Sequence, residues 1–174
     1  MWDIFVQGIG FVGMAVLAVS YQCKSNRSLL LWQILSSVIF ATQFGLLSSW
    51  SGMFANLVAI VRCVLLVMGE RARRWYVLAF LLSLGVLSFV MALCVFDEVL
   101  WIALLLLAYN LGSTLVLWTD NGKYIRIAQA SVWSPIWIVN NVYYFSIAGI
   151  IAEGINITSS VVALWRYRKT GFTK

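Results

Sequence analysis

Residues 75–95 read WYVLAFLLSLGVLSFVMALCV, and none of these side chains carries a charge. The hydrocarbon core of a bilayer is about 30 Å thick, and crossing it takes about 20 apolar residues in α-helical form. The stretch has the length and the composition of a transmembrane helix. It therefore decides the class of fold, an integral membrane protein built from helices.

The composition of the whole chain agrees with this stretch. The 174 residues are 63% hydrophobic and 10% charged, whereas about 25% of the residues in a soluble domain are charged. This excludes a soluble globular domain and a disordered chain. The chain has no His, which excludes a histidine-based catalytic triad and a His-rich metal site. We expect no metal and no cofactor, and the three Cys have no metal-like spacing.

Six further runs of similar length surround the first one. The seven predicted spans are Ile4–Gln22, Ser28–Leu47, Gly52–Gly69, Trp75–Val95, Val99–Trp118, Ile127–Phe145 and Ala148–Trp165. Only short Ser- and Gly-containing stretches separate the second span from the third and the sixth from the seventh. An unbroken helix over 28–61 would be about 50 Å long, too long for one crossing, so a break is expected there.

The charged residues support seven spans independently. With seven spans, all four segments on one side of the membrane contain Lys or Arg. The charged residues of the segments on the other side are all acidic, namely Asp3, Asp97 and Glu98. Eleven of the twelve basic residues lie in the four segments on the first side, and only Arg62 lies inside a span; the eleven are Lys24, Arg27, Arg71, Arg73, Arg74, Lys123, Arg126, Arg166, Arg168, Lys169 and Lys174. The positive-inside rule then predicts a cytoplasmic C-terminus and an N-terminus outside. The net charge of +6 is thereby explained by topology, and no nucleic-acid partner is expected.

The first three and the last three spans have the same layout, which indicates a duplication. Asn56 pairs with Asn156 at an offset of 100, and the short basic loops pair at an offset of 99. Both triplets begin on the outer side, so they are predicted to be parallel repeats joined by the fourth span. The predicted units are a triple-helix bundle over 1–70, a linker helix over 71–97, and a second bundle with a basic tail over 98–174.

Short sequence motifs are distributed over most of the chain. They are Ser20–Ser25, Ala59–Arg62, Trp137–Asn141, Ser146–Gly149, Glu153-Gly154 and Trp165–Arg168. These motifs resemble the YgjV family of bacterial inner-membrane proteins. The three-plus-one-plus-three layout is similar to the SWEET, SemiSWEET and PQ-loop transporter superfamily. The resemblance implies a multi-pass protein of the bacterial inner membrane with a SWEET-like fold, and it implies no particular substrate.

The chain departs from that superfamily at one motif. The Pro-Gln pair that ends the first helix of the superfamily is replaced by Tyr21-Gln22, and the only proline is Pro135. The flexibility that the proline provides in the superfamily would then come from glycines in the first and fifth spans, namely Gly8, Gly10, Gly13 and Gly112.

Polar side chains inside the spans are the candidate site. Such groups are costly in hydrocarbon, so they point toward neighbouring helices or into a cavity. The predicted substrate-binding residues are Asn56, Asn156, Trp137, Asn141, Asn110 and Arg62. Resemblance to SWEET-like proteins, in which a Trp and an Asn from each half contact the sugar, implies that Asn56 and Asn156 face each other. The alternative is that these amides only hold helices together.

Two charged residues inside the spans have two interpretations each. Arg62 either extends along its helix to the cytoplasmic surface or lines the inner half of a pathway, near an anionic group of the substrate. Glu153 is either an acid at the outer interface or a buried carboxylate that carries a proton.

The leading hypothesis is a transporter or facilitator of a small polar solute, such as a sugar, that works by alternating access. The alternative is a non-transporting structural or assembly protein of the membrane. An enzyme is not expected, because the chain lacks His, paired carboxylates within a span and a Gly-x-Ser-x-Gly elbow. The expected partners are the lipid bilayer and the solute, and the state is a monomer or a homo-oligomer.

Overall fold

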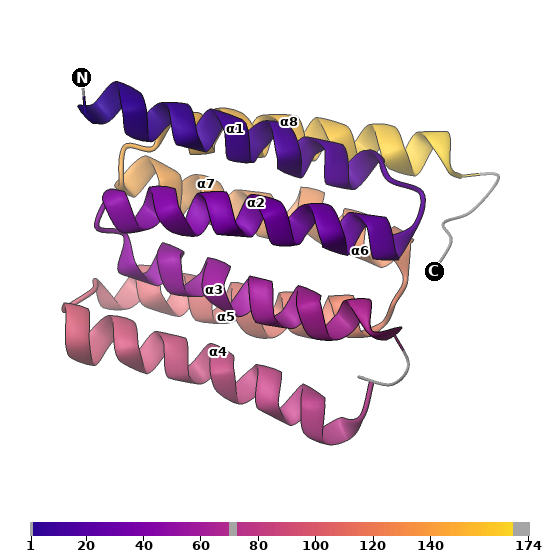
Figure 1. Ribbon diagram of the computed structural model, residues 1–174, viewed down its shortest axis with the longest axis horizontal. Coiled ribbons are helices and arrows are strands. Elements are labelled where there is room, and N and C mark those ends of the chain that lie inside the picture. Colours follow the sequence, from indigo (N-terminus) through magenta and orange to yellow (C-terminus); the bar gives the residue numbers. More distant parts are fainter. Residues whose placement is uncertain (1, 70–72, 169–174) are drawn as a thin grey trace.

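The computed structural model describes residues 2–69 and 73–168, so Arg71, Lys169, Lys174 and the side chain of Asp3 lie outside the described part. The helical segments are α1 (Trp2–Gln22), α2 (Asn26–Leu46), α3 (Trp50–Val67), α4 (Trp75–Phe96), α5 (Leu100–Trp118), α6 (Gly122–Ala128), the π-helical turn η2 (Gln129–Trp133), α7 (Ser134–Tyr143) and α8 (Ile147–Arg166). Because α6, η2 and α7 follow one another without a break, the described chain forms seven helical rods (Figure 1).

Six of these helices, α1 to α5 and α8, are long and apolar enough to cross a membrane. Their ends agree with six of the predicted spans to within two residues. This part of the prediction is confirmed, because a charge-free run of about 20 residues leaves little freedom in where a spanning helix begins and ends.

The seventh rod, α6–η2–α7, contains most of the predicted span Ile127–Phe145. It begins five residues earlier, at Gly122, and ends two residues earlier, at Tyr143. Its 22 residues make about 33 Å of helix. Pro135 lacks the N–H that would bond to the carbonyl one turn earlier, and its ring crowds that carbonyl. The π turn lies directly before this proline, where a wider turn relieves the crowding.

Six rods form a ring, and α4 lies outside it (Figure 1). Around the ring, α1 packs against α2, α2 against α3, α3 against α5, α5 against α6 and α7, α7 against α8, and α8 against α1. Helix α4 packs on the outer side of α3 and α5. The chain reverses direction at each connection, so the N-terminal and C-terminal ends lie at opposite ends of the bundle.

The two ends of the bundle differ in charge and are tied differently. At the basic end, Arg73 forms a salt bridge of 3.2 Å with Asp120, and the Asn26 side chain donates to the Asp120 carbonyl at 2.9 Å. At the other end, Glu98 accepts hydrogen bonds from the Ser51 backbone N–H at 2.9 Å and from the Tyr144 hydroxyl. Each network joins connections from both halves of the chain.

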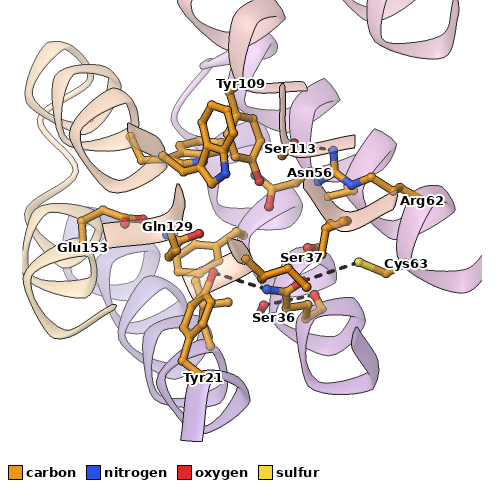
Figure 2. A pocket seen from close by; sticks show the side chains of 18 of the residues that line it. Tyr21, Ser36, Ser37, Asn56, Arg62, Cys63, Tyr109, Ser113, Gln129 and Glu153 are labelled. Atoms are coloured by element: carbon orange, nitrogen blue, oxygen red, sulfur yellow. Dashed lines mark hydrogen bonds between the residues drawn. The ribbon is translucent and has the colours of Figure 1, made fainter. Parts of the chain in front are cut away.

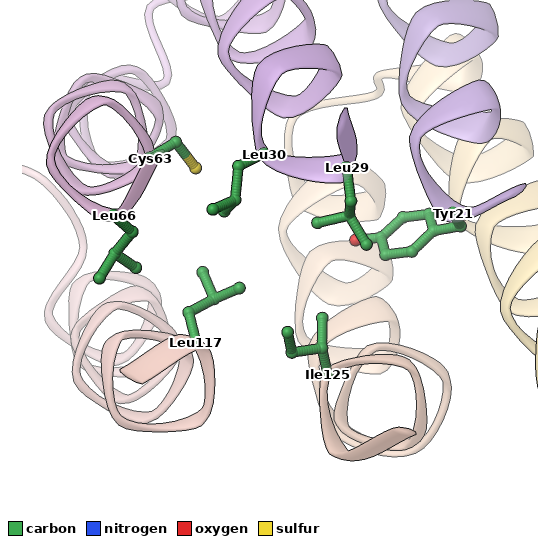
Figure 3. Close-up of a cluster of buried hydrophobic side chains, with 7 residues drawn as sticks. All are labelled: Tyr21, Leu29, Leu30, Cys63, Leu66, Leu117 and Ile125. Atoms are coloured by element: carbon green, nitrogen blue, oxygen red, sulfur yellow. The ribbon is translucent and has the colours of Figure 1, made fainter. Parts of the chain in front are cut away.

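A cluster of buried apolar side chains closes the ring near its basic end (Figure 3). It is contributed by α1, α2, α3, α5 and α6 and consists of Tyr21, Leu29, Leu30, Cys63, Leu66, Leu117 and Ile125. Several of these side chains also form the wall of a cavity above them. The cluster therefore lies at the end of the cavity that is nearest the connections with the basic residues.

Candidate functional site

A central cavity lies inside the ring (Figure 2), and the centre of a water molecule can reach a volume of about 70 Å³ in it. By this measure about 10–15 Å³ holds one water molecule, so the cavity has room for several waters or a small solute. Every rod of the ring contributes to its wall, whereas the described part of α4 contributes no residue. The polar and charged residues of the wall are Tyr21, Gln33, Ser36, Ser37, Asn56, Arg62, Tyr109, Ser113, Gln129, Asn141 and Glu153.

Aromatic rings form one wall of the cavity around Trp137. Its ring stacks on Phe44, with centroids 5.3 Å apart and planes 24° apart. The ring of Tyr109 meets Trp137 at 5.2 Å and 75°, and it meets Trp133 at 5.8 Å and 82°. Trp137 thus lines the cavity as predicted, but one of its faces already packs against Phe44.

Four residues spaced four apart on the bent rod, Gln129, Trp133, Trp137 and Asn141, all face the cavity. In an α-helix, positions four apart drift by about 40° at each step. The π turn over Gln129–Trp133 has more residues per turn and offsets part of this drift. The prediction missed Gln129, although its spacing from the two tryptophans in the sequence could have revealed it.

Two glycines allow large side chains to reach the wall. A Cβ atom on Gly149 would lie 2.3 Å from Asn141 Oδ1, and a Cβ atom on Gly112 would lie 2.3 Å from the Trp133 ring. Such distances are far below van der Waals contact, so a side chain at either position would force its neighbour to shift. Gly112 therefore allows Trp133 to pack closely on α5; its expected role in helix flexibility stays a prediction.

Arg62 is buried, with 2% of its surface exposed, and it lines the cavity. Its Nη1 donates to the carbonyl of Asn110 at 3.3 Å, to Ser113 Oγ at 2.6 Å and to Thr114 Oγ1 at 3.2 Å. The guanidinium also lies 5.8 Å from the centre of the Tyr109 ring. It reaches across to α5 instead of extending to the membrane surface, which excludes the first of the two interpretations made for it.

The charge of Arg62 is not neutralised within the described part of the chain. No described carboxylate lies within ion-pair distance of it, and its Nε has no hydrogen-bond partner among these residues. A buried cation without a counter-ion is costly in a low-dielectric interior. A cation in this position can pair with an anionic group that enters the cavity.

Glu153 lies on another part of the wall and is 5% exposed. Its polar neighbours are Ser134 and Asn156. Within the described residues, Glu153 Oε2 and both amide atoms of Asn156 make no hydrogen bond of normal geometry. Glu153 is therefore a buried acid of the cavity, which excludes the interpretation as an acid at the outer interface.

The structure brings together only part of the predicted site. Asn56 is in the wall, and its amide nitrogen donates to the Gly52 carbonyl of its own helix at 2.9 Å. Asn156 is completely buried beside Glu153 and is not among the residues of the wall. Asn110 is also outside the wall, and its side chain points to Ser88 of α4 at 3.5 Å. The facing pair of asparagines is therefore not part of this cavity.

Arg126 was expected only to mark the cytoplasmic side, yet its side chain is fully buried. It donates to the carbonyls of Tyr21 at 3.2 Å, Cys23 at 2.5 Å and Gly122 at 2.9 Å. It thereby satisfies carbonyls at the C-terminal end of α1, which have no partner within their own helix. Neither this role nor the place of Tyr21 in the wall has a signature in the sequence, where both residues resemble ordinary helix-end residues.

Long apolar helices around a polar cavity define an α-helical integral membrane protein. The family model of the bacterial inner membrane protein Imp-YgjV matches residues 4–171. The chain belongs to this family, and it is a multi-pass protein of the bacterial inner membrane. No curated protein and no solved structure matches the chain.

Proposed function

We propose that the protein moves a small polar solute across the bacterial inner membrane by alternating access at the central cavity. One observation carries the proposal: all six rods of the ring line a cavity whose wall holds buried polar atoms that have no hydrogen-bond partner among the described residues. Unpaired polar groups within a membrane are costly, so they are retained where a ligand or water satisfies them. We assign solute contacts to Arg62, Asn56, Asn141, Trp137 and Glu153.

The motion that we propose is a rocking of two halves, α1–α3 and α5–α8, related as parallel repeats with α4 as the linker. The packing supports this proposal, because α3 against α5 and α8 against α1 are equivalent contacts when the halves are exchanged. In each half the middle rod, α2 or α6–α7, lies between the other two. A cavity between such halves can open to either side in turn.

We further propose that the basic end of the bundle faces the cytoplasm. Apart from Arg62 in the cavity wall, the described basic residues lie in the connections and helix ends at that end, whereas Asp97 and Glu98 lie in the connection between α4 and α5 at the other, in keeping with the positive-inside rule. A green fluorescent protein fused to the C-terminus should fluoresce in cells, and an alkaline phosphatase fused there should be inactive. Active phosphatase at the C-terminus would reverse the orientation.

Transport is tested with purified protein in liposomes and a defined panel of radiolabelled solutes: glucose, glycerol, glycine, γ-aminobutyrate and acetate. We expect uptake of at least one of them above that of empty liposomes. Ser37→Leu fills the cavity and should abolish this uptake, because Ser37 lies in the wall. Ser83→Leu is the matched control, because Ser83 is exposed on α4.

The outcome that contradicts the proposal is equally specific. If the panel is not transported and a stoichiometric partner protein co-purifies, the non-transporting assembly role is favoured. If uptake occurs but Ser37→Leu and Ser83→Leu reduce it equally, the solute does not pass through this cavity.

A further inference from the structure

The wall of the central cavity contains two residues of opposite formal charge, Arg62 on α3 and Glu153 on α8. Both are more than nine-tenths buried, with 2% and 5% of their surfaces exposed. They do not form a salt bridge with each other. Figure 2 shows them on opposite sides of the pocket. The cavity thus has a cationic side and an acidic side.

Each of the two groups has an unused polar atom within the described residues. Arg62 Nε and Glu153 Oε2 lack hydrogen-bond partners there. The hydroxyls around Arg62 and the polar neighbours of Glu153 solvate the charges only in part. Two opposite charges held apart in a low-dielectric interior are more costly than a contacting pair. A ligand with complementary charges at both ends would remove this cost.

We propose that the cavity binds a small zwitterion, with its carboxylate at Arg62 and its ammonium group at Glu153. This inference rests on the proposed function, since it names the solute class of the same cavity. A guanidinium matches a carboxylate in charge and in planar geometry. The aromatic ring of Trp137 in the cavity wall adds an apolar surface for the methylene groups of such a ligand.

The two charges lie at different levels along the bundle. Helices α3 and α8 begin at the same end of the bundle (Figure 1). Arg62 follows Trp50, the first residue of α3, by 12 residues, and Glu153 follows Ile147, the first of α8, by 6. At 1.5 Å per residue, their backbone positions differ by about 9 Å along the axis. The long Arg62 side chain shortens this distance, because helical side chains lean toward the N-terminus. The cavity volume of about 70 Å³ limits the ligand to a small molecule, which favours a short amino acid over a peptide.

The test is binding to the detergent-solubilised protein, measured as the change in its thermal unfolding midpoint. The probes are glycine, β-alanine, γ-aminobutyrate and 5-aminovalerate, each compared with butyrate, n-butylammonium and glucose at equal ionic strength. We expect at least one zwitterion to raise the midpoint by about 2–4 °C. We expect affinities at least about tenfold weaker for the singly charged and neutral probes, because each leaves one buried charge unpaired.

Variants assign each end of the ligand to its partner. In Glu153→Gln, the zwitterion should bind no better than butyrate, and Glu153→Asp should restore the preference. In Arg62→Gln, the zwitterion should bind no better than n-butylammonium. Asp97→Asn removes an exposed carboxylate outside the cavity and should leave the preference unchanged. Because no proton gradient is present, the readout separates charge recognition from proton coupling.

Three outcomes overturn the inference: no stabilisation by any zwitterion in the series, butyrate binding as tightly as γ-aminobutyrate in the unaltered protein, or glucose binding more tightly than both. A failure of the proposed function would give a different experimental result. Zwitterion binding without flux into liposomes would refute transport and retain the inference. Flux of glucose without zwitterion binding would support transport and refute the inference.

Discussion

Ser113 on α5 accepts the shortest of the hydrogen bonds donated by Arg62 of α3, at 2.6 Å. The hydroxyls of Ser113 and Thr114 in turn donate to the carbonyl of Asn110, at 3.3 Å and 2.7 Å. These hydroxyls therefore keep a partner even when the arginine is absent. The arginine, in contrast, depends on them, because no described carboxylate pairs with it.

The first prediction is that Ser113→Ala destabilises the protein more than Arg62→Met does. Ser113→Ala removes a hydrogen bond to a buried charge and should lower the free energy of unfolding by about 1.5–3 kcal/mol. Arg62→Met removes the buried charge itself and should change the free energy by less than about 1 kcal/mol. Unfolding in detergent followed by tryptophan fluorescence measures both.

Ser83→Ala is the control for this pair. Ser83 is exposed on α4 and donates only to the Phe80 carbonyl of its own helix, so a change within about 0.5 kcal/mol is expected. If Arg62→Met proves the more destabilising of the two variants, Arg62 holds the fold together, and its assignment to a ligand loses its physical basis.

The second prediction concerns Gly112, where a Cβ atom would lie 2.3 Å from the Trp133 ring. Gly112→Ala forces this ring and the cavity wall to shift, which should destabilise the protein by about 1–3 kcal/mol. Gly8→Ala is the matched substitution, because no atom of the described residues lies within 4 Å of a Cβ atom there. It should stabilise α1 by about 0.5–1 kcal/mol. The measurement is thermal unfolding of both variants, and equal effects would show that Trp133 does not pack on Gly112.

The third prediction distinguishes two roles of Arg126 at the basic end, namely stabilising the fold and orienting the protein in the membrane. Arg126→Gln and Lys123→Gln each remove one positive charge from the same short helix, so their effects on orientation in the membrane should be equal. Arg126 is buried and bonds to three carbonyls, whereas Lys123 is exposed. Arg126→Gln should cost about 2–4 kcal/mol of unfolding free energy, and Lys123→Gln less than about 0.5 kcal/mol. Equal stabilities would mean that Arg126 acts only as a topology marker.

The sequence predicted the long spans well and the site only in part, for physical reasons. A span such as 75–95 is fixed by the thickness of the bilayer and by its charge-free composition, which are local properties. Helical periodicity correctly placed Trp137 and Asn141 on an inward face. It could not determine how far each helix is rotated, so Asn156 was expected in the cavity wall.

Residues whose role depends on distant parts of the chain were missed or placed wrongly. Arg126 bonds to carbonyls more than 100 residues away, and no local pattern distinguishes it from an exposed loop arginine. The side chain of Asn110 points to α4 because α4 packs on α5. The parallel repeat and the transport cycle remain predictions, which the cavity supports.

The last prediction concerns the acidic end, where Glu98 connects the beginning of α3 with the end of α7. Its carboxylate accepts from the Ser51 N–H at 2.9 Å and from the Tyr144 hydroxyl. The negative charge also lies at the N-terminus of α3, where the helix dipole favours it. Glu98→Gln should lower the free energy of unfolding by about 1–3 kcal/mol, and Tyr144→Phe by about 1 kcal/mol. The double variant should be destabilised less than the sum of the two single variants, with a coupling energy of about 0.5–3 kcal/mol.

Asp97→Asn is the control. Asp97 is next to Glu98, but it is exposed and has a left-handed backbone conformation that Asn tolerates, so this substitution should change stability little. Additive effects of Glu98→Gln and Tyr144→Phe would show that this contact does not tie the two halves together.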